Sequence, residues 1–154
     1  MMITDPQTPL IALLGGLRDA IGAELHARLR ELGFAEIRPA HGCVFGNIQP
    51  DGSRLTELAD RSGITKQSVG EAVADLERLG FVERVPDPDD GRAKIIRLTP
   101  HGAEAMAAAQ EIFDDIEGRL AEELGHDNFH RFRETLVHVH ELMQPATEAA
   151  PRAA

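Results

Sequence analysis

The sequence lacks the cysteine pairs that form disulfides and the long apolar runs that form membrane spans. Cys43 is its only cysteine, so an intrachain disulfide is excluded and a reducing, cytoplasmic environment is expected. No apolar run approaches the roughly 20 residues that a membrane span requires. Residues 1–9 contain no basic segment of the kind that opens a cleavable signal peptide. We therefore expect a protein that does not interact with membranes.

Motifs of catalysis and cofactor binding are also missing. The chain contains no GxSxG, no P-loop and no GxGxxG after an expected strand. It has no CxxC and no HExxH, so no motif defines a metal site. Cys43 has no obvious general base at a diagnostic spacing. The sequence therefore predicts a protein that is not an enzyme and that carries no cofactor.

Positive charge is scarce, with 16 basic against 26 acidic residues and a formal net charge of −10. This balance argues against nucleic acid as a partner, but the acidic residues are unevenly distributed. Between Ser53 and Thr99 there are eight basic and nine acidic residues, so most of the negative charge lies elsewhere. If this stretch binds DNA, its affinity must depend on a few contacts rather than on a basic patch.

The stretch from Ser53 to Thr99 has the order helix, turn, helix, hairpin. In the first helix, Leu55, Leu58 and Ala59 form one apolar face, and Ser53 and Thr56 are both candidate N-caps. Gly63 suits the left-handed conformation that ends a helix. The second helix has Thr65 as its expected cap and Gly80 after its end. Its apolar stripe is Val69, Ala72, Val73, Leu76 and Leu79.

The opposite face of the second helix is polar and small, which suits a helix that approaches DNA bases. It contains Gln67, Glu71, Ala74 and Arg78, with Lys66 in the first turn and Ser68 and Gly70 beside it. Glutamine can pair with adenine in a bidentate manner, and lysine can reach guanine or phosphate. This order of elements predicts a winged helix-turn-helix that places its second helix in the major groove.

The hairpin is predicted from two β-type runs, Phe81 to Val85 and Ala93 to Leu98. Pro86 and Pro88 exclude a helix between them, and Asp90-Gly91 is a strong turn signal. Arg92 follows this turn, and we expect the Asp90 carboxylate to hold its guanidinium in one orientation. An oriented arginine on a thin wing suits the minor groove, and Lys94 can reach phosphates nearby.

These residues resemble a known family. Asp90-x-Arg92 followed by Leu98-Thr99, after the segment LERLGFVER from Leu76 to Arg84, closely resembles the MarR family of bacterial regulators. The resemblance extends from about Leu10 to about Met143. It implies a homodimer on a double-stranded, pseudo-palindromic operator, usually a repressor that a small-molecule effector or an oxidant releases. The predicted DNA-binding residues are Arg54, Thr65, Lys66, Gln67, Ser68, Gly70, Asp90, Arg92 and Lys94.

The flanking segments are expected to be mainly helical. After a flexible N-terminus (1–9), the lobe of residues 10–48 contains a helix from Pro9 to about Leu32 and a second from about Arg38 to Ile48. Residues 100–143 form two more helices, one ending at Gly125 and one capped by Asp127, before a disordered tail (144–154). Since no sheet covers the first and last helices, we expect them to interlock in a dimer. The fold class is thus mainly α with a β-hairpin wing and flanking dimerisation helices.

The effector site is predicted from the resemblance alone. In MarR-like proteins a pocket lies between the helical lobe and the winged helix-turn-helix. The candidate lining residues here are Arg18, His41, Phe45 and Met106. The alternative is that His41 and Phe45 only pack.

Two other classes of function remain as alternatives. The first is a thiol- or metal-responsive regulator that uses Cys43, or His126 and His130 at a spacing of four. Peroxide-sensing members carry a reactive cysteine near the start of the first helix, beside tyrosines, whereas this chain has no tyrosine and Cys43 lies in the second expected helix. The second alternative is an adaptor that keeps the winged fold for protein contacts.

Overall fold

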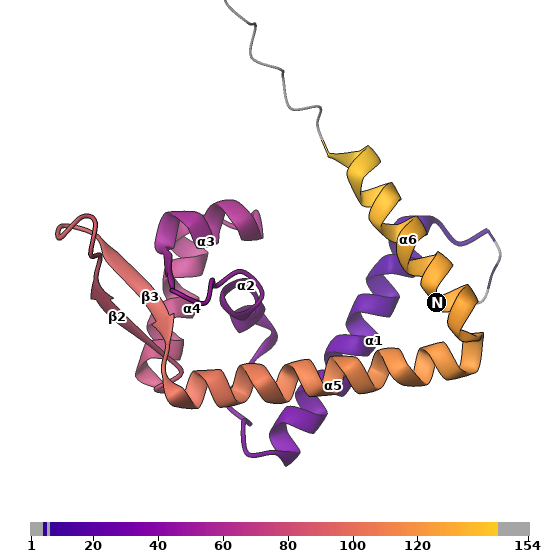
Figure 1. Cartoon of the computed structure of the whole chain (residues 1–154), viewed down its shortest axis with the longest axis horizontal. Helices are drawn as coiled ribbons and strands as arrows, with labels where there is room; N and C mark the ends of the chain where they lie inside the picture. The colour runs from indigo at the N-terminus through magenta and orange to yellow at the C-terminus, as the bar shows by residue number, and fades with distance from the viewer. Residues whose placement is uncertain (1–4, 6, 145–154) are drawn as a thin grey trace, which may run out of the picture. The chain divides into compact units, whose positions relative to one another are not determined.

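A computed structural model gives the structure of the chain, and it describes residue 5 and residues 7–144. The flexible N-terminus and the tail expected from the sequence lie mostly outside the described residues. The chain forms two compact units, the first ending at Phe113 and the second beginning at Asp114. Figure 1 gives the labels of the helices and strands.

The predicted long N-terminal helix is confirmed as α1 (Leu10–Glu31). Leu29 is its one buried residue, and Gly33, with φ 93°, follows its end. The second expected helix is much shorter than predicted. A 3₁₀ turn, η1 (Pro39–His41), leads into α2 (Gly42–Phe45), and the chain leaves the helix well before Ile48. Glycines at positions 42 and 46 lower the helix propensity of this segment, which explains the difference.

The two helices of the helix-turn-helix have the predicted boundaries. They are α3 (Leu55–Ser62) and α4 (Lys66–Arg78), and Gly63 between them has φ 66°. Thr65 caps α4, because its hydroxyl accepts the backbone N–H of Ser68 at 3.2 Å. Neither of the two candidate caps serves α3. Arg54 occupies the N-cap position, and its backbone N–H donates to the Glu57 carboxylate at 2.9 Å.

The wing belongs to a three-stranded antiparallel sheet with the order β1-β3-β2. The expected hairpin is formed by β2 (Val82–Pro86) and β3 (Lys94–Leu98), in which Val82 faces Leu98 and Arg84 faces Ile96. The sequence did not predict β1 (Ser53–Arg54), which pairs with Ile96 and Ile95 of β3. Figure 1 shows the hairpin projecting beside α3 and α4.

One core holds this first unit together. Phe81, directly before β2, is 1% exposed and packs with side chains of α2, α3, α4 and the sheet. The backbone approaches closely at Gly102, where an added Cβ would lie 1.9 Å from the carbonyl oxygen of Phe81. The buried residues of the cluster are Val44, Leu58, Ala59, Val69, Ala72, Val73, Leu76, Phe81, Val82, Ile96 and Ala105.

The C-terminal helices are α5 (Pro100–Leu124) and α6 (His126–Met143). Thr99 caps α5 as predicted, since its hydroxyl accepts the Gly102 N–H at 3.1 Å and donates to the Gly80 carbonyl at 2.5 Å. The predicted cap of α6 was wrong: Gly125, with φ 83°, occupies the N-cap position, and Asp127 lies in the first turn. No described helix is long and apolar enough to cross a membrane.

The predicted fold class is therefore confirmed as mainly α with a small antiparallel sheet, arranged as a winged helix-turn-helix with flanking helices.

Candidate nucleic-acid interface

The outer face of α4 is polar and open, as the sequence predicts. Lys66, Gln67, Ser68 and Glu71 are all exposed, while the apolar stripe of the helix is buried against the core. The side-chain amide of Gln67 donates to the Glu71 carboxylate at 3.2 Å, so it is oriented along the helix surface. The hydroxyls of Thr65 and Ser68 lie 2.9 Å apart at the N-terminus. This face offers donors and acceptors suited to base edges.

Gly70 differs from its neighbours in its surroundings. It is half-buried, and an added Cβ would lie 3.8 Å from Cδ2 of Leu55, the first residue of α3. The structure thus places Gly70 at the contact between α3 and α4 rather than among the most exposed positions of α4.

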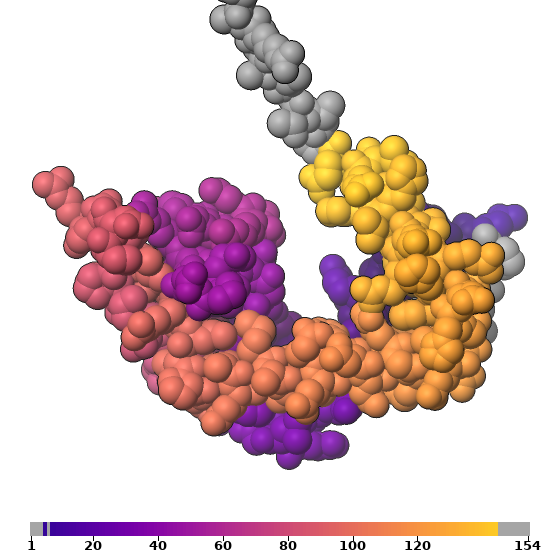
Figure 2. All heavy atoms as spheres, in the orientation of Figure 1, coloured from indigo at the N-terminus to yellow at the C-terminus, as the bar shows by residue number. Residues whose placement is uncertain are grey.

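The tip of the wing is exposed at Asp90, Gly91 and Arg92. The Asp90 carboxylate accepts a hydrogen bond from the backbone N–H of Arg92 at 3.1 Å. The backbone carbonyl of Asp90 accepts a second one from the N–H of Ala93 at 2.8 Å. The sequence predicted a bond from Asp90 to the Arg92 guanidinium, but this carboxylate holds the turn backbone instead. Figure 2 shows the wing extending beyond the body of α3 and α4.

A buried carboxylate, Asp87, anchors the base of the wing. One of its oxygens accepts the Asp89 N–H at 2.9 Å, and the other accepts Nε of Arg54 at 2.6 Å. The Asp89 hydrogen bond and the Arg54 guanidinium keep the pKa of Asp87 below its usual range, against the opposing effect of burial. Asp87 in turn raises the pKa of Arg54. Arg54, predicted as a DNA contact, thus lies across the base of the wing, and nothing local in the sequence signals this pair.

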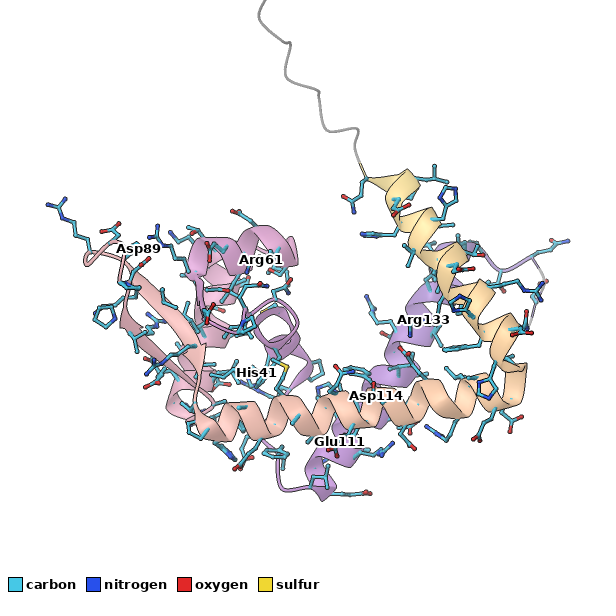
Figure 3. All side chains as sticks on the ribbon, viewed as in Figure 1. His41, Arg61, Asp89, Glu111, Asp114 and Arg133 are labelled. Atoms are coloured by element: carbon cyan, nitrogen blue, oxygen red, sulfur yellow. The ribbon has the colours of Figure 1, made fainter. Side chains whose placement is uncertain are left out.

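A second anchor joins the turn before α3 to that helix. The guanidinium of Arg61, labelled in Figure 3, donates to the carbonyl of Asn47 at 3.1 Å and to the hydroxyl of buried Ser53 at 3.0 Å. Ser53 was a candidate cap, and its oxygen instead accepts from Arg61 and from the Gln49 N–H.

The cations of the reading region (residues 53–99) divide into two groups. Five arginines have carboxylate, hydroxyl or carbonyl partners within the fold: Arg54, Arg61, Arg78, Arg84 and Arg97. Within the described part of the chain, Lys66, Arg92 and Lys94 form no ion pair. These three lie at the start of α4 and along the wing, so the unpaired positive charge gathers where the sequence predicts DNA contacts.

The residues predicted to bind an effector lie in three different places. Phe45 and Met106 line one cavity of about 380 Å³ in the first unit, formed by α1, α2 and α5. Arg18 lines a separate, open groove beside the C-terminal half of α1. His41 is 1% exposed and lines neither, because its Nε2 lies 2.9 Å from the Asp75 carboxylate.

Asp75 collects three donors on the inner side of α4. Its Oδ1 accepts from Arg78 at 2.6 Å, and its Oδ2 accepts from His41 and from the Arg38 guanidinium. Arg78, then His41 and Arg38, lower the pKa of Asp75 to about 2, so it is ionised at neutral pH. Sequence reasoning missed this cluster because Arg38 and His41 lie 37 and 34 positions before Asp75 in the sequence.

The surroundings of Cys43 and of the two histidines of α6 do not favour the thiol-responsive or metal-responsive alternatives. Cys43 is half-buried, its Sγ lies 3.1 Å from the Ala40 carbonyl oxygen, and burial raises the pKa of its thiol. A raised pKa disfavours the reactive thiolate. His126 and His130 both lie in α6, and His130 is 3.2 Å from Glu134. Among residues 5 and 7–144, no group of three histidine, cysteine or acidic side chains is arranged to hold a metal.

Comparison with known proteins also indicates a DNA-binding regulator. The family model described as "MarR family" matches residues 37–93. The transcriptional regulator HosA of Escherichia coli O111:H- is 32% identical over an alignment of 90 residues that covers 49% of this chain and 67% of HosA.

Solved structures extend the similarity of fold over most of the chain. The crystal structure of MarR superimposes with a TM-score of 0.74 at 24% identity, covering 89% of this chain and 92% of that one. The Staphylococcus aureus MepR–DNA complex gives a TM-score of 0.72 at 22% identity, covering 91% of this chain and all of MepR.

Proposed function

The chain belongs to the MarR family of transcriptional regulators, and from this premise we propose that it acts as a dimeric repressor released from its operator by a small-molecule effector. In this proposal α4 enters the major groove and the wing reaches the adjacent minor groove. The proposed contacts on α4 are Lys66, Gln67 and Ser68, and those on the wing are Arg92 and Lys94. The similarity of fold to MepR, which was solved in complex with DNA, supports this arrangement.

The distribution of unpaired cations carries the proposal. The reading region is not basic overall, but four of its acidic side chains pair with arginines that brace the fold. Lys66, Arg92 and Lys94 form no ion pair with the described residues, so they remain available to an outside anion. DNA phosphates are such anions. Because they are closely spaced along the duplex, several cations on one surface of the protein can each neutralise a phosphate and add to the affinity.

Exposed apolar side chains support a dimer. On α1, Leu10 and Ile11 are 58% and 78% exposed, and on α6, Leu142 and Met143 are 70% and 78% exposed. Large apolar side chains in such numbers at helix ends are unfavourable in water and mark surfaces that a partner covers. A second copy of the chain is the proposed partner, and a two-fold dimer would match the symmetry of a palindromic operator.

The apolar cavity lined by Phe45 and Met106 is the proposed effector site. Its volume of about 380 Å³ lies within the range of small-molecule pockets. A reducing cytoplasm is the proposed location, as for a regulator that must reach DNA.

Selection from random-sequence DNA tests this function. We expect the enriched sequences to share an inverted repeat whose half-sites lie about one helical turn apart. An enriched motif without two-fold symmetry would contradict the dimeric arrangement. Recovery of no common sequence would contradict sequence-specific regulation altogether and favour the adaptor alternative.

A further inference from the structure

Glu71 places a carboxylate on the face of α4 that is proposed to meet DNA. The side chain is exposed and lies one helical turn after Gln67, whose amide donates to Oε1 of Glu71 at 3.2 Å. The other two acidic residues of α4, Asp75 and Glu77, both pair with arginines. Glu71 forms no ion pair with any residue that the structure describes. The reading helix therefore presents an uncompensated negative charge on its outer face.

A carboxylate at this position is costly in a complex with DNA. Contact with the duplex removes water from it, and an ionised group that loses water without gaining a hydrogen-bond donor is strongly unfavourable. The phosphates on either side of the groove are also negative and repel it. The Gln67 amide supplies a donor to Oε1, so Oε2 still requires one. For a helix seated in the major groove, the base edges are the nearest source of such a donor.

One base presents a donor in the major groove without an acceptor beside it. Cytosine offers its N4 amino group, whereas guanine offers the acceptors O6 and N7, and thymine offers the acceptor O4 and a methyl group. Adenine has the N6 amino group, but its N7 acceptor lies next to it and repels a carboxylate. An ionised glutamate in the groove therefore favours cytosine over the other three bases.

We infer that Glu71 is a specificity-determining residue that accepts a hydrogen bond from the N4 amino group of one cytosine in each operator half-site. The Gln67 amide holds one oxygen of the carboxylate and leaves the other for the base. This inference rests on the proposed function, because it requires α4 to occupy the major groove. It adds the base that α4 selects, which cations bound to phosphates do not determine.

A purely electrostatic role for Glu71 predicts a different result. If Glu71 only repels phosphates, its removal should raise the affinity for every DNA sequence by the same factor. If Glu71 reads cytosine, its removal should also abolish the preference for cytosine at one position of each half-site. Base preference, rather than affinity, therefore distinguishes the two roles.

The first test is selection from random-sequence DNA with full-length wild type, Glu71→Ala and Glu77→Ala. We expect wild type to select cytosine at one symmetric pair of positions, and Glu71→Ala to lower that preference to less than about twofold while the rest of the motif is kept. Glu77→Ala is the matched control and should select the wild-type motif. It removes the same charge from the same helix, but the Glu77 carboxylate lies 3.3 Å from Nε of Arg84 in β2.

The second test replaces the selected cytosine with N4-methylcytosine at both symmetric positions. This base still pairs with guanine, but its methyl group replaces the N4 hydrogen that faces the major groove. In mobility-shift titrations, we expect the replacement to weaken wild-type binding at least about tenfold and Glu71→Ala binding less than about twofold. The same modified base in flanking DNA outside the motif should change neither affinity.

Three outcomes would overturn the inference. Glu71→Ala could select the same cytosine as wild type, it could bind all sequences more tightly by one common factor, or N4-methylcytosine could leave wild-type binding unchanged. In each of these cases wild type still selects a motif, so the proposed function survives. Recovery of no motif with wild type would instead contradict the proposed function and this inference together. Circular dichroism shows whether each variant is folded, and the modified operator tests the contact with wild type alone.

Discussion

Individual ion pairs explain how an acidic protein can present a DNA-reading surface. The reading region has nearly equal numbers of acidic and basic side chains, and four of its nine carboxylates, those of Asp75, Glu77, Glu83 and Asp87, pair with arginines of the same region. Arg54 braces the wing through Asp87, and Arg78 joins Asp75 on α4. Lys66, Arg92 and Lys94 are left facing outward, so location rather than net charge determines what the surface can bind.

Asp75 should make the stability of the fold depend on pH in acid. Its pKa is lowered from the ordinary 3.8 to about 2, so the native state favours the ionised form. The resulting stabilisation is complete above about pH 4 and is lost as the pH falls toward about 2. We predict that Asp75→Asn unfolds at lower urea concentration than wild type at pH 6, and that the difference narrows at pH 3. Equal differences at the two pH values would contradict the assignment.

Arg54 should support the wing rather than contact DNA directly. If it acts through Asp87, then Arg54→Ala and Asp87→Asn should weaken operator binding by similar factors, because either change releases the base of the wing. If Arg54 instead contacts a phosphate, Asp87→Asn should leave affinity unchanged or increase it, since a competing carboxylate is removed. Electrophoretic mobility shifts of both variants distinguish the two cases.

At the scale of helices, two glycines should respond oppositely to the same substitution. Gly70→Ala places a Cβ 3.8 Å from Leu55 in ordinary contact, so the gain in helix propensity should raise the free energy of unfolding by about 0.5–1 kcal/mol. Gly102→Ala places a Cβ 1.9 Å from the Phe81 carbonyl oxygen, so this substitution should lower the free energy of unfolding by about 1–3 kcal/mol. Urea denaturation measures both, and a destabilised Gly70→Ala variant would contradict the described packing of α3 on α4.

Local sequence signals predicted the helices and turns well, and non-local contacts explain what they missed. Thr65 and Thr99 were identified as caps because a capping hydrogen bond involves only the next three residues. Gly63 was identified as a helix end because its left-handed conformation depends on the residue type at that one position. By contrast, β1 has two residues and no periodicity, and it exists because Ile95 and Ile96 of β3 offer it a partner.

The same reasoning separates the predicted and missed parts of the candidate site. The exposed face of α4 follows from helical periodicity, so Lys66, Gln67 and Ser68 were accessible to prediction. The pairs Arg54–Asp87 and Arg38–Asp75 join residues 33 and 37 positions apart, and no local pattern encodes them. Asp127 was predicted as a cap from residue type alone, whereas the positive φ at Gly125 sets where α6 begins.

At the scale of the whole molecule, the exposed apolar helix faces predict self-association. Ile11 and Leu142 are 78% and 70% exposed, so replacing either with glutamate removes little packing within one chain. We predict that Ile11→Glu and Leu142→Glu shift sedimentation from dimer toward monomer while circular dichroism remains that of a helical protein. Ala74→Glu, on the exposed face of α4, is the control and should remain dimeric while losing DNA binding. Unchanged sedimentation of both apolar-face variants would contradict the dimer proposed here.

The most direct test of the central claim is a salt titration of binding to the selected operator, with wild type and Arg92→Ala. Each phosphate-neutralising cation contributes about 0.9 to the slope of log affinity against log salt concentration, and a dimer carries two copies of Arg92. The account predicts that Arg92→Ala lowers the slope by about 2 and weakens binding at least about tenfold. Arg119→Ala, an equal loss of charge on α5 beside Asp115, should change neither. An Arg92→Ala protein with the wild-type slope and affinity would show that the wing does not contact DNA and would contradict the account.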